Sequence, residues 1–124
     1  KSFITMTPQE ASFVKYAINS YLGMRVTFFN QLHDAALDFS CSPQRIIDAV
    51  SADKRIGYSH TRVPGFDGKK GFGGACLPKD MNAFVKFNED LTLIAESVKI
   101  NNKMREEYEL DEREKDNNIK FEDK

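Results

Sequence analysis

An unbroken helical pattern from Pro8 to Phe39 constrains the fold of this chain most. The segment TPQE at residues 7–10 matches a capping box, with Thr7 as N-cap, Pro8 first in the helix and Glu10 third. Apolar residues then recur at helical spacing, with no proline before Pro43: Phe13, Ala17, Tyr21, Met24, Phe28, Leu32, Ala35 and Phe39. Such a helix is about 48 Å long, too long for one compact domain of this size to cover. We therefore predict a central helix that packs against a second copy of the chain or against other domains.

Shorter helical patterns and one long loop make up the rest of the chain. Ser42 and Pro43 begin a short helix that ends near residue 52, and residues 53–75 hold six of the seven glycines. A third helix is predicted from Pro78 to Asn88, and a fourth follows with Asp90 as its N-cap. The pattern predicts an all-α fold with a long central helix, three shorter helices and one glycine-rich loop. Residues 1–105 form one domain, and the charge-dense residues 106–124 form a tail that is a helical extension or disordered.

Composition excludes several classes of function. Lys and Arg (18) nearly balance Asp and Glu (19) over the 124 residues, so neither a nucleic-acid partner nor a membrane surface is expected. No apolar run is long enough for a membrane span. Two cysteines indicate a reducing, cytoplasmic setting, and with only two histidines no metal site is expected.

Charge is spread unevenly along the chain. Between residues 54 and 79 there are six Lys or Arg side chains and a single acid, Asp67, whereas nine acids and four bases follow Arg105. A basic loop suits an anionic substrate such as a nucleotide phosphate. A loop whose lysines are merely solvated has the same composition, so the charge alone leaves both interpretations open.

The segment GFGGACLPKD at residues 71–80 places Cys76 between a glycine-rich turn and the first turn of a helix. Glycine allows a positive φ and a close approach of a ligand. The positive end of the helix dipole and the neighbouring Lys79 both favour a thiolate at Cys76. The pattern therefore predicts a nucleophile, against the alternative of an ordinary loop cysteine.

Two polar residues of the long helix share one face. Lys15 and Asn19 are four residues apart, within a helix that is otherwise largely apolar. Burying such groups without partners costs about 1–3 kcal/mol. They therefore reach solvent, pair internally or line a site.

Three segments, in this order, carry a family resemblance: KYAINSYLGMRVTFFN at residues 15–30, DKRIG at residues 53–57, and GFGGACLPKD at residues 71–80. Together they resemble the central domain of the UDP-glucose/GDP-mannose dehydrogenase family, over about residues 7–104. The resemblance implies an all-α fold like the C-terminal domain of 6-phosphogluconate dehydrogenase, with a homodimer formed through the long helix. It implies oxidation of UDP-glucose to UDP-glucuronate in two NAD-dependent steps, with UDP-sugar as the bound partner.

The resemblance also implies roles for four catalytic residues. Cys76 attacks the C6 aldehyde, and the thiohemiacetal becomes a thioester that water hydrolyses. Lys15 stabilises the oxyanion at C6, Asn19 holds the same region or positions a water, and Asp80 acts with that water as a general base.

Substrate-binding roles follow in the same way. Arg55 matches an arginine that crosses the dimer to the neighbouring subunit's sugar, and Phe72, Gly73 and Lys79 line the substrate. Residues 58–70 are assigned only to a substrate loop.

No strand followed by a dinucleotide-binding glycine motif is found in the sequence. NAD would therefore be bound by a domain that this chain lacks, and the chain alone is expected to be inactive. Two alternatives stay open: a substrate such as GDP-mannose or a UDP-N-acetyl-hexosamine, or a dimerisation module whose site residues are idle.

Overall fold

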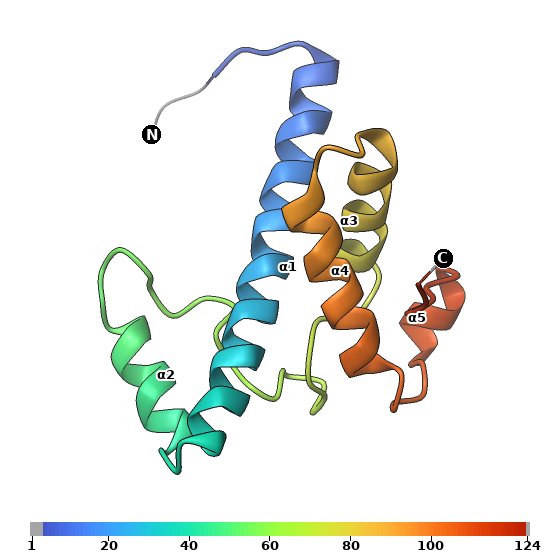
Figure 1. The fold of residues 1–124 in the computed structure, drawn as a ribbon. Coiled ribbons are helices and arrows are strands. Elements are labelled where there is room, and N and C mark those ends of the chain that lie inside the picture. Colours follow the sequence, from blue (N-terminus) through green and yellow to red (C-terminus); the bar gives the residue numbers. More distant parts are fainter. Residues whose placement is uncertain (1–3, 124) are drawn as a thin grey trace.

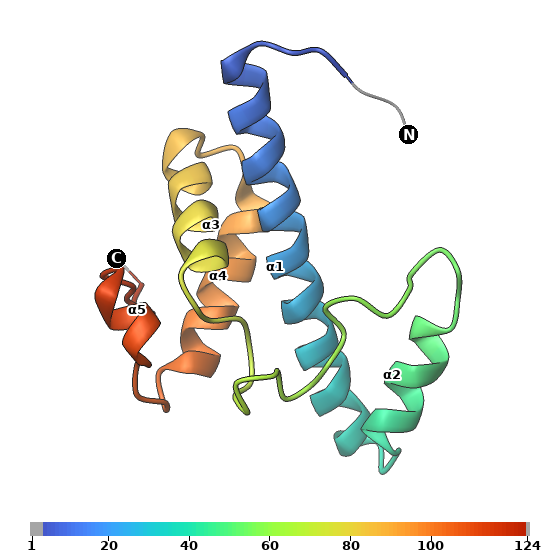
Figure 2. The same cartoon turned by 180° about the vertical axis from the view of Figure 1, so that it is seen from behind.

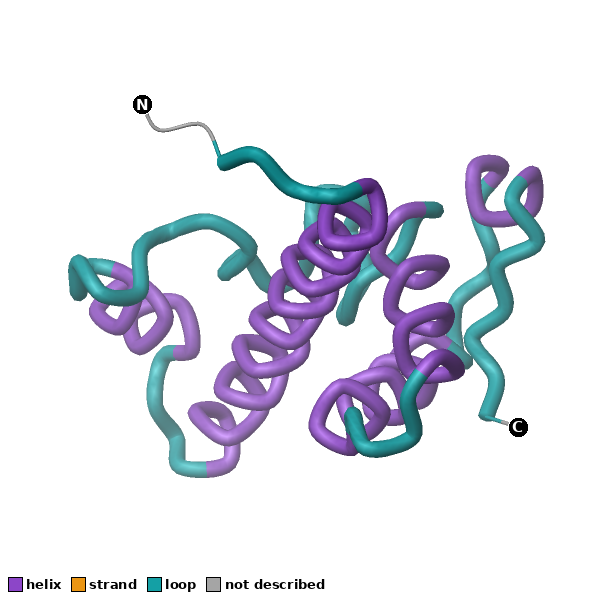
Figure 3. The backbone as a smooth tube through the Cα atoms, turned by 90° about the horizontal axis from the view of Figure 1, so that it is seen from above, coloured by secondary structure: helices purple, strands orange, loops and turns teal. Residues whose placement is uncertain are grey.

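The computed structural model describes residues 4–123 and is all-helical over that range, as the sequence predicts. It has five helices, α1 (Pro8–Asp38), α2 (Pro43–Ser51), α3 (Cys76–Phe87), α4 (Thr92–Arg105) and α5 (Glu112–Asp116) (Figure 1). Seen from above, the described backbone consists of helices and loops only (Figure 3). None of these helices is both long enough and apolar enough to cross a membrane.

Helix α1 is the element around which the others are arranged. It contacts α2, α3 and α4, and α3 also contacts α4. Helices α3 and α4 lie along one side of α1, while α2 lies on the other side near the end of α1 (Figures 1 and 2). The loop between α2 and α3 passes back across α1, so the glycine-rich segment reaches the α3 side.

Local signals fix the starts of the first two helices. The Thr7 hydroxyl accepts a hydrogen bond from the Glu10 N–H at 3.1 Å, and the Glu10 carboxylate accepts one from the Thr7 N–H at 2.9 Å. This confirms the predicted capping box. Helix α1 ends at Asp38, and the Ser42 hydroxyl then caps α2, with Pro43 as its first residue.

The predicted start of α3 is wrong by two residues and that of α4 by one. Helix α3 begins at Cys76, so Pro78 is its third residue, a position whose N–H has no partner within the helix in any case. Helix α4 begins at Thr92 with Leu91 as N-cap, so Asp90 is not the cap. The Asn88 side chain instead accepts a hydrogen bond from the Asp90 N–H, which forms a turn before the helix.

Two buried apolar clusters hold the helices together. One joins α1, α2 and the loop through Phe29, Ile47 and Val63, and the other joins the loop, α3 and α4 through Phe72, Met81 and Val98. At Gly23, α1 and α3 approach so closely that a Cβ atom would overlap the Met81 sulfur. The absence of a side chain at Gly23 therefore sets the distance between these helices.

The charged segment after Arg105 folds back onto the domain. It contains α5, whose N-cap Asp111 forms a second capping box with Glu114. Glu114 and Ile119 are buried, although most of the segment is exposed. The boundary at residue 105 stays a prediction.

Candidate active site

Asp80, on α3, is the centre of a polar cluster and is only 1% exposed. The Asn19 side-chain amide donates a hydrogen bond of 2.6 Å to Asp80 Oδ2, and Lys15 Nζ lies 3.9 Å from the same oxygen. Lys79 Nζ lies 3.8 Å from Oδ1. The structure thus brings together the lysine and asparagine that share one face of α1 with the carboxylate of α3.

The members of this cluster differ in how firmly they are held. Asp80 Oδ1 is buried and accepts no hydrogen bond from the described residues. The Lys15 and Lys79 side chains are 61% and 58% exposed, so each ion pair with Asp80 contributes little to stability. Asn19 is therefore the fixed partner of the carboxylate, whereas the two amines are exposed and available to a ligand.

Cys76 lies on the same face of α3 as Asp80, because four residues separate them in one helix. Its thiol is free and exposed. Cys76 is the first residue of α3, and the N-cap Ala75 makes no side-chain hydrogen bond to the first turn. The N–H groups at this end of α3 carry a partial positive charge that favours an anion.

Two buried asparagines hold the glycine turn that precedes Cys76. The Asn30 side chain accepts a hydrogen bond of 3.0 Å from the Gly71 N–H. The Asn101 side chain accepts from the Phe72 N–H at 2.7 Å and donates to the Phe72 carbonyl at 2.9 Å. Gly71 itself has φ of 77°, which glycine adopts without strain. Sequence reasoning assigned no role to Asn30 or Asn101.

Phe72 and Gly73 line a cavity of about 530 Å³ between the loop and the segment after Arg105. The cavity wall includes three arginines, Arg62, Arg105 and Arg113, and one acid, Asp67. The Arg62 guanidinium stacks on the Phe66 ring, 4.6 Å from its centroid. The two predicted substrate residues thus adjoin a space with anion-binding chemistry.

Arg55 lies outside this cluster and does not line the cavity. Its side chain is 88% exposed, and its guanidinium lies 2.8 Å from the Asp53 carboxylate. Hydrogen bonds from Arg55 hold the pKa of Asp53 below its usual value, and the same pair raises the pKa of Arg55. Arg55 therefore points into solvent, within its own loop.

Arg25 anchors the start of this loop to α1, a role that sequence reasoning did not assign. Its guanidinium donates hydrogen bonds to the carbonyls of Ile56, Gly57 and Ser59, at distances from 2.7 to 3.3 Å. The only prior signal was an arginine within an apolar helix. The loop that carries Arg55 is thus fixed to the helix that carries Lys15 and Asn19.

The arrangement supplies the groups required for covalent chemistry at a carbonyl. It places a thiol at a helix N-terminus, an ammonium, an amide and a buried carboxylate on facing sides of α1 and α3. A thiol can form a bond to a carbonyl carbon, and an ammonium can stabilise the resulting oxyanion. Among residues 4–123 no group of three or more metal-ligating side chains is found.

Known proteins match this chain over most of its length. A model of the UDP-glucose/GDP-mannose dehydrogenase family, central domain, matches residues 9–104. The UDP-glucose 6-dehydrogenase of Campylobacter jejuni is 44% identical over 75 residues, which are 60% of this chain and 18% of that protein. The UDP-glucose 6-dehydrogenase of Streptococcus pneumoniae is 36% identical over 100 residues, 80% of this chain and 24% of that protein.

A third relative, the UDP-glucose 6-dehydrogenase of Rhizobium meliloti, is 30% identical over 77% of this chain and 22% of its own length. The chain therefore spans about a fifth of the length of the curated relatives that it matches. The matched residues 9–104 contain Lys15, Asn19, Cys76 and Asp80.

Proposed function

The chain belongs to the UDP-glucose/GDP-mannose dehydrogenase family, and from this premise we propose that it provides the covalent and hydrolytic part of an NAD-dependent oxidation of UDP-glucose to UDP-glucuronate. The observation that carries the proposal is the convergence of Lys15 and Asn19 on the buried Asp80, one helical turn after Cys76. The relatives with matching sequence are UDP-glucose 6-dehydrogenases, which favours UDP-glucose over GDP-mannose or a UDP-N-acetyl-hexosamine.

In the proposed reaction, the Cys76 thiolate attacks the aldehyde carbon C6 of the oxidised sugar. A carbon–sulfur bond forms, and the carbonyl electron pair moves to oxygen, where the Lys15 ammonium stabilises the oxyanion. The amide of Asn19 keeps Asp80 in place beside that oxyanion. The product of this step is a thiohemiacetal.

After oxidation to the thioester, water attacks C6 and the carbon–sulfur bond breaks. Asp80 accepts the water proton, and its Oδ1 accepts no hydrogen bond from the described residues. The Cys76 sulfur is released from C6 as the thiolate, and the sugar leaves as a carboxylate. The roles of Cys76, Lys15, Asn19 and Asp80 are proposals of this mechanism.

The complete oxidation also requires NAD as the hydride acceptor. Residues 4–123 form helices and no strand, so they do not fit a dinucleotide, which family folds hold on a strand–helix–strand unit. We therefore assign no step through NAD to this chain, and we expect the chain by itself not to reduce NAD with UDP-glucose. Formation of NADH by the isolated chain would contradict this part of the proposal.

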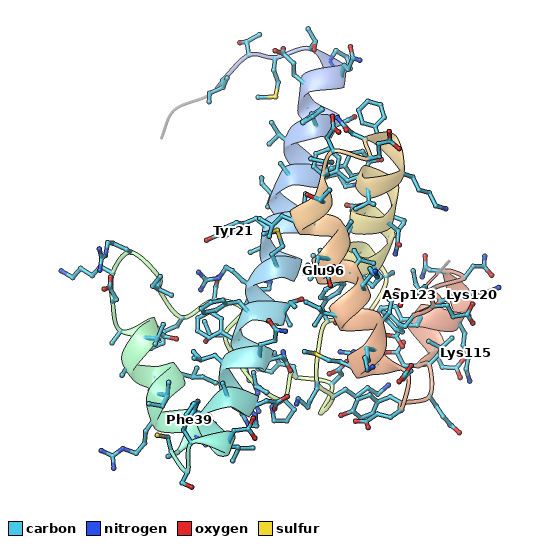
Figure 4. The ribbon with its side chains drawn as sticks, in the orientation of Figure 1. Tyr21, Phe39, Glu96, Lys115, Lys120 and Asp123 are labelled. Atoms are coloured by element: carbon cyan, nitrogen blue, oxygen red, sulfur yellow. The ribbon has the colours of Figure 1, made fainter. Side chains whose placement is uncertain are left out.

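We also propose a homodimer formed through α1. Large apolar side chains that lie on one face of this helix are exposed: Val14, Ile18, Tyr21 and Phe28. Figure 4 shows Tyr21 projecting away from α3 and α4. A partner on this face would cover an apolar stripe, and we propose that its Arg55 reaches the sugar bound by this chain, as the family resemblance implies. The two free, exposed thiols favour a reducing, cytoplasmic setting for such a dimer.

The test uses UDP-glucose oxidised to the aldehyde and labelled with carbon-13 at C6. Incubated with the chain without NAD, it is expected to give a thiohemiacetal carbon signal in the NMR spectrum. The Cys76→Ser variant should lose this signal, whereas Cys41→Ser, at the other free thiol, should keep it. An equal signal from both variants, or none from the unmodified chain, would contradict the proposal, and a signal lost only with Cys41→Ser would move the nucleophile.

A further inference from the structure

The carboxylate of Glu114 reaches the glycine turn from a segment outside the family-matched residues. The match ends at residue 104, and Glu114 lies in α5, on the outer side of α3 and α4 (Figures 1 and 3). Side chains such as Lys115 and Lys120 extend from this segment (Figure 4). Glu114 is instead only 1% exposed, which is unusual for a carboxylate in a solvated tail.

Both oxygens of this carboxylate are occupied. Oε2 accepts a hydrogen bond of 2.8 Å from the Gly74 N–H, two residues before Cys76. Oε1 accepts one of 3.0 Å from the Asp111 N–H, within the capping box of α5. The same residue therefore begins α5 and holds the backbone of the glycine turn.

Arg105 supplies the opposite charge and is 2% exposed. Its Nη1 lies 3.7 Å from Glu114 Oε2 and 2.9 Å from Asp67 Oδ2. Its Nη2 donates a hydrogen bond of 2.9 Å to the Gly71 carbonyl. The ion pair thus contacts the turn at both ends, Gly71 through the cation and Gly74 through the anion.

The turn is shaped to receive this pair. A Cβ atom at Gly73 would overlap the side chains of both Arg105 and Glu114. Gly74 has φ of 77°, a conformation that glycine adopts without strain, and the Arg113 guanidinium lies over it. A buried ion pair is weak evidence for stability as such, because its desolvation offsets its attraction. Its contact with the backbone beside Cys76 indicates a role in geometry.

We infer that Glu114 is a positioning residue for Cys76, and that residues 106–123 are part of the site. The carboxylate holds the Gly74 N–H, and this sets the position at which the backbone passes from the glycine turn into α3 at Cys76. The importance of this position for catalysis rests on the proposed function. The hydrogen bond and its effect on the thiol do not, and they can be measured without sugar or cofactor.

Three variants of the full chain separate this role from a general loss of folding. Glu114→Ala removes both hydrogen bonds. Glu114→Gln keeps one acceptor oxygen, which faces Arg105 and Gly74 because the guanidinium repels the NH₂ group. This variant retains the turn contact and loses only the hydrogen bond from the Asp111 N–H. Glu112→Ala, at an exposed position of the same helix, is the matched control.

The first readout is hydrogen exchange of the Gly74 amide by NMR. Exchange should be faster by about tenfold or more in E114A, as expected for loss of a bond to a charged acceptor. It should stay near the unmodified rate in E114Q and E112A. The second readout is the rate of iodoacetamide alkylation of Cys76 divided by that of Cys41. This ratio should exceed one in the unmodified chain, fall toward one in E114A, and stay near the unmodified value in E114Q.

Unchanged Gly74 exchange in E114A, with helical content retained by circular dichroism, would overturn the contact. Faster exchange with an unchanged alkylation ratio would overturn the positioning role and leave a structural one. If E114A does not fold, E114Q decides, because altered Gly74 exchange or an altered alkylation ratio in that variant overturns the proposal. Failure of the proposed oxidation would show only in the labelled-aldehyde experiment.

Discussion

The side-chain amide of Asn19 donates a hydrogen bond of 2.6 Å to Asp80, across 61 residues of sequence. It joins α1 to α3 at the one buried acid of the cluster. Without this amide, the only partners of the buried Asp80 carboxylate would be two largely exposed lysines. The hydrogen bond from the amide therefore offsets part of the desolvation cost of burying the acid.

Replacing Asn19 with alanine should lower the free energy of unfolding by about 1.5–3 kcal/mol, because it leaves a buried charge without its donor. Urea unfolding followed by circular dichroism measures this change. Lys15→Ala is the control on the same face of α1, and it should cost less than about 1 kcal/mol because that ion pair is exposed. Equal losses in the two variants would contradict the role given to the amide.

Gly23→Ala should destabilise the chain by about 1–3 kcal/mol, although alanine favours helix. The added Cβ would overlap the sulfur of Met81, a side chain with no exposed surface. Thermal or urea unfolding tests this directly. The double variant Gly23→Ala, Met81→Ala should lose less than the sum of the two single losses, since the new methyl group occupies vacated space. Strict additivity would show that the two residues do not interact.

Acid should weaken the attachment of the glycine loop to α1. The Lys70 ammonium and the His33 ring both contact the Asp34 carboxylate. Partial burial raises the pKa of Asp34, but hydrogen bonds to Lys70 and His33 outweigh it and hold this pKa below its usual value of 3.8. A lowered folded-state pKa stabilises the fold above the unfolded-state value, and this stabilisation is lost as the pH falls through the folded-state pKa.

Unfolding free energies measured between about pH 5 and pH 2 should therefore fall less steeply in Asp34→Asn than in the unmodified chain. Asp38→Asn is the control one turn further along α1, at an exposed acid that makes no ion pair among residues 4–123. Parallel pH profiles for the unmodified chain and Asp34→Asn would show that the contact contributes nothing to stability.

The exposed face of α1 predicts association. Light scattering coupled to gel filtration should give twice the mass of one chain, because a contiguous stripe of exposed apolar side chains marks an interaction surface. The double variant Ile18→Glu, Tyr21→Glu should be a monomer with unchanged helical content. Leu93→Glu, at an apolar residue of α4 that is 70% exposed, should remain a dimer. A mass equal to one unmodified chain would contradict the proposed dimer.

Sequence predicts best the features that depend on neighbours along the chain. The capping box at Thr7 and the Ser42 cap are local signals, and both helices begin where these signals place them. The start of α3 was missed because its N-cap, Ala75, makes no side-chain hydrogen bond and gives no such signal. Helical spacing likewise paired Lys15 with Asn19, but their contact with Asp80 requires packing of α1 on α3.

The residues that hold the glycine turn could not be predicted in this way. Asn101 contacts Phe72 from 29 residues away, and Glu114 contacts Gly74 from 40 residues away. Composition indicated a solvated tail around Glu114, since its neighbours are mostly charged and exposed. A single buried acid leaves no periodic signal, and its function depends on tertiary contacts alone.

Helix α1 holds the long loop by hydrogen bonds near both of its ends. Arg25 binds the carbonyls at its beginning, and Asn30 binds the Gly71 N–H near its end. Between them, residues 60–64 hydrogen-bond to no helix among residues 4–123. Packing also holds the middle of the loop, because Val63 is buried against Phe29 and Ile47. The exposed side chains of Arg62 and Phe66 line the cavity but belong to neither attachment. Substitutions at these two positions can therefore change the proposed substrate cavity while the hydrogen bonds of Arg25 and Asn30 to the loop stay in place.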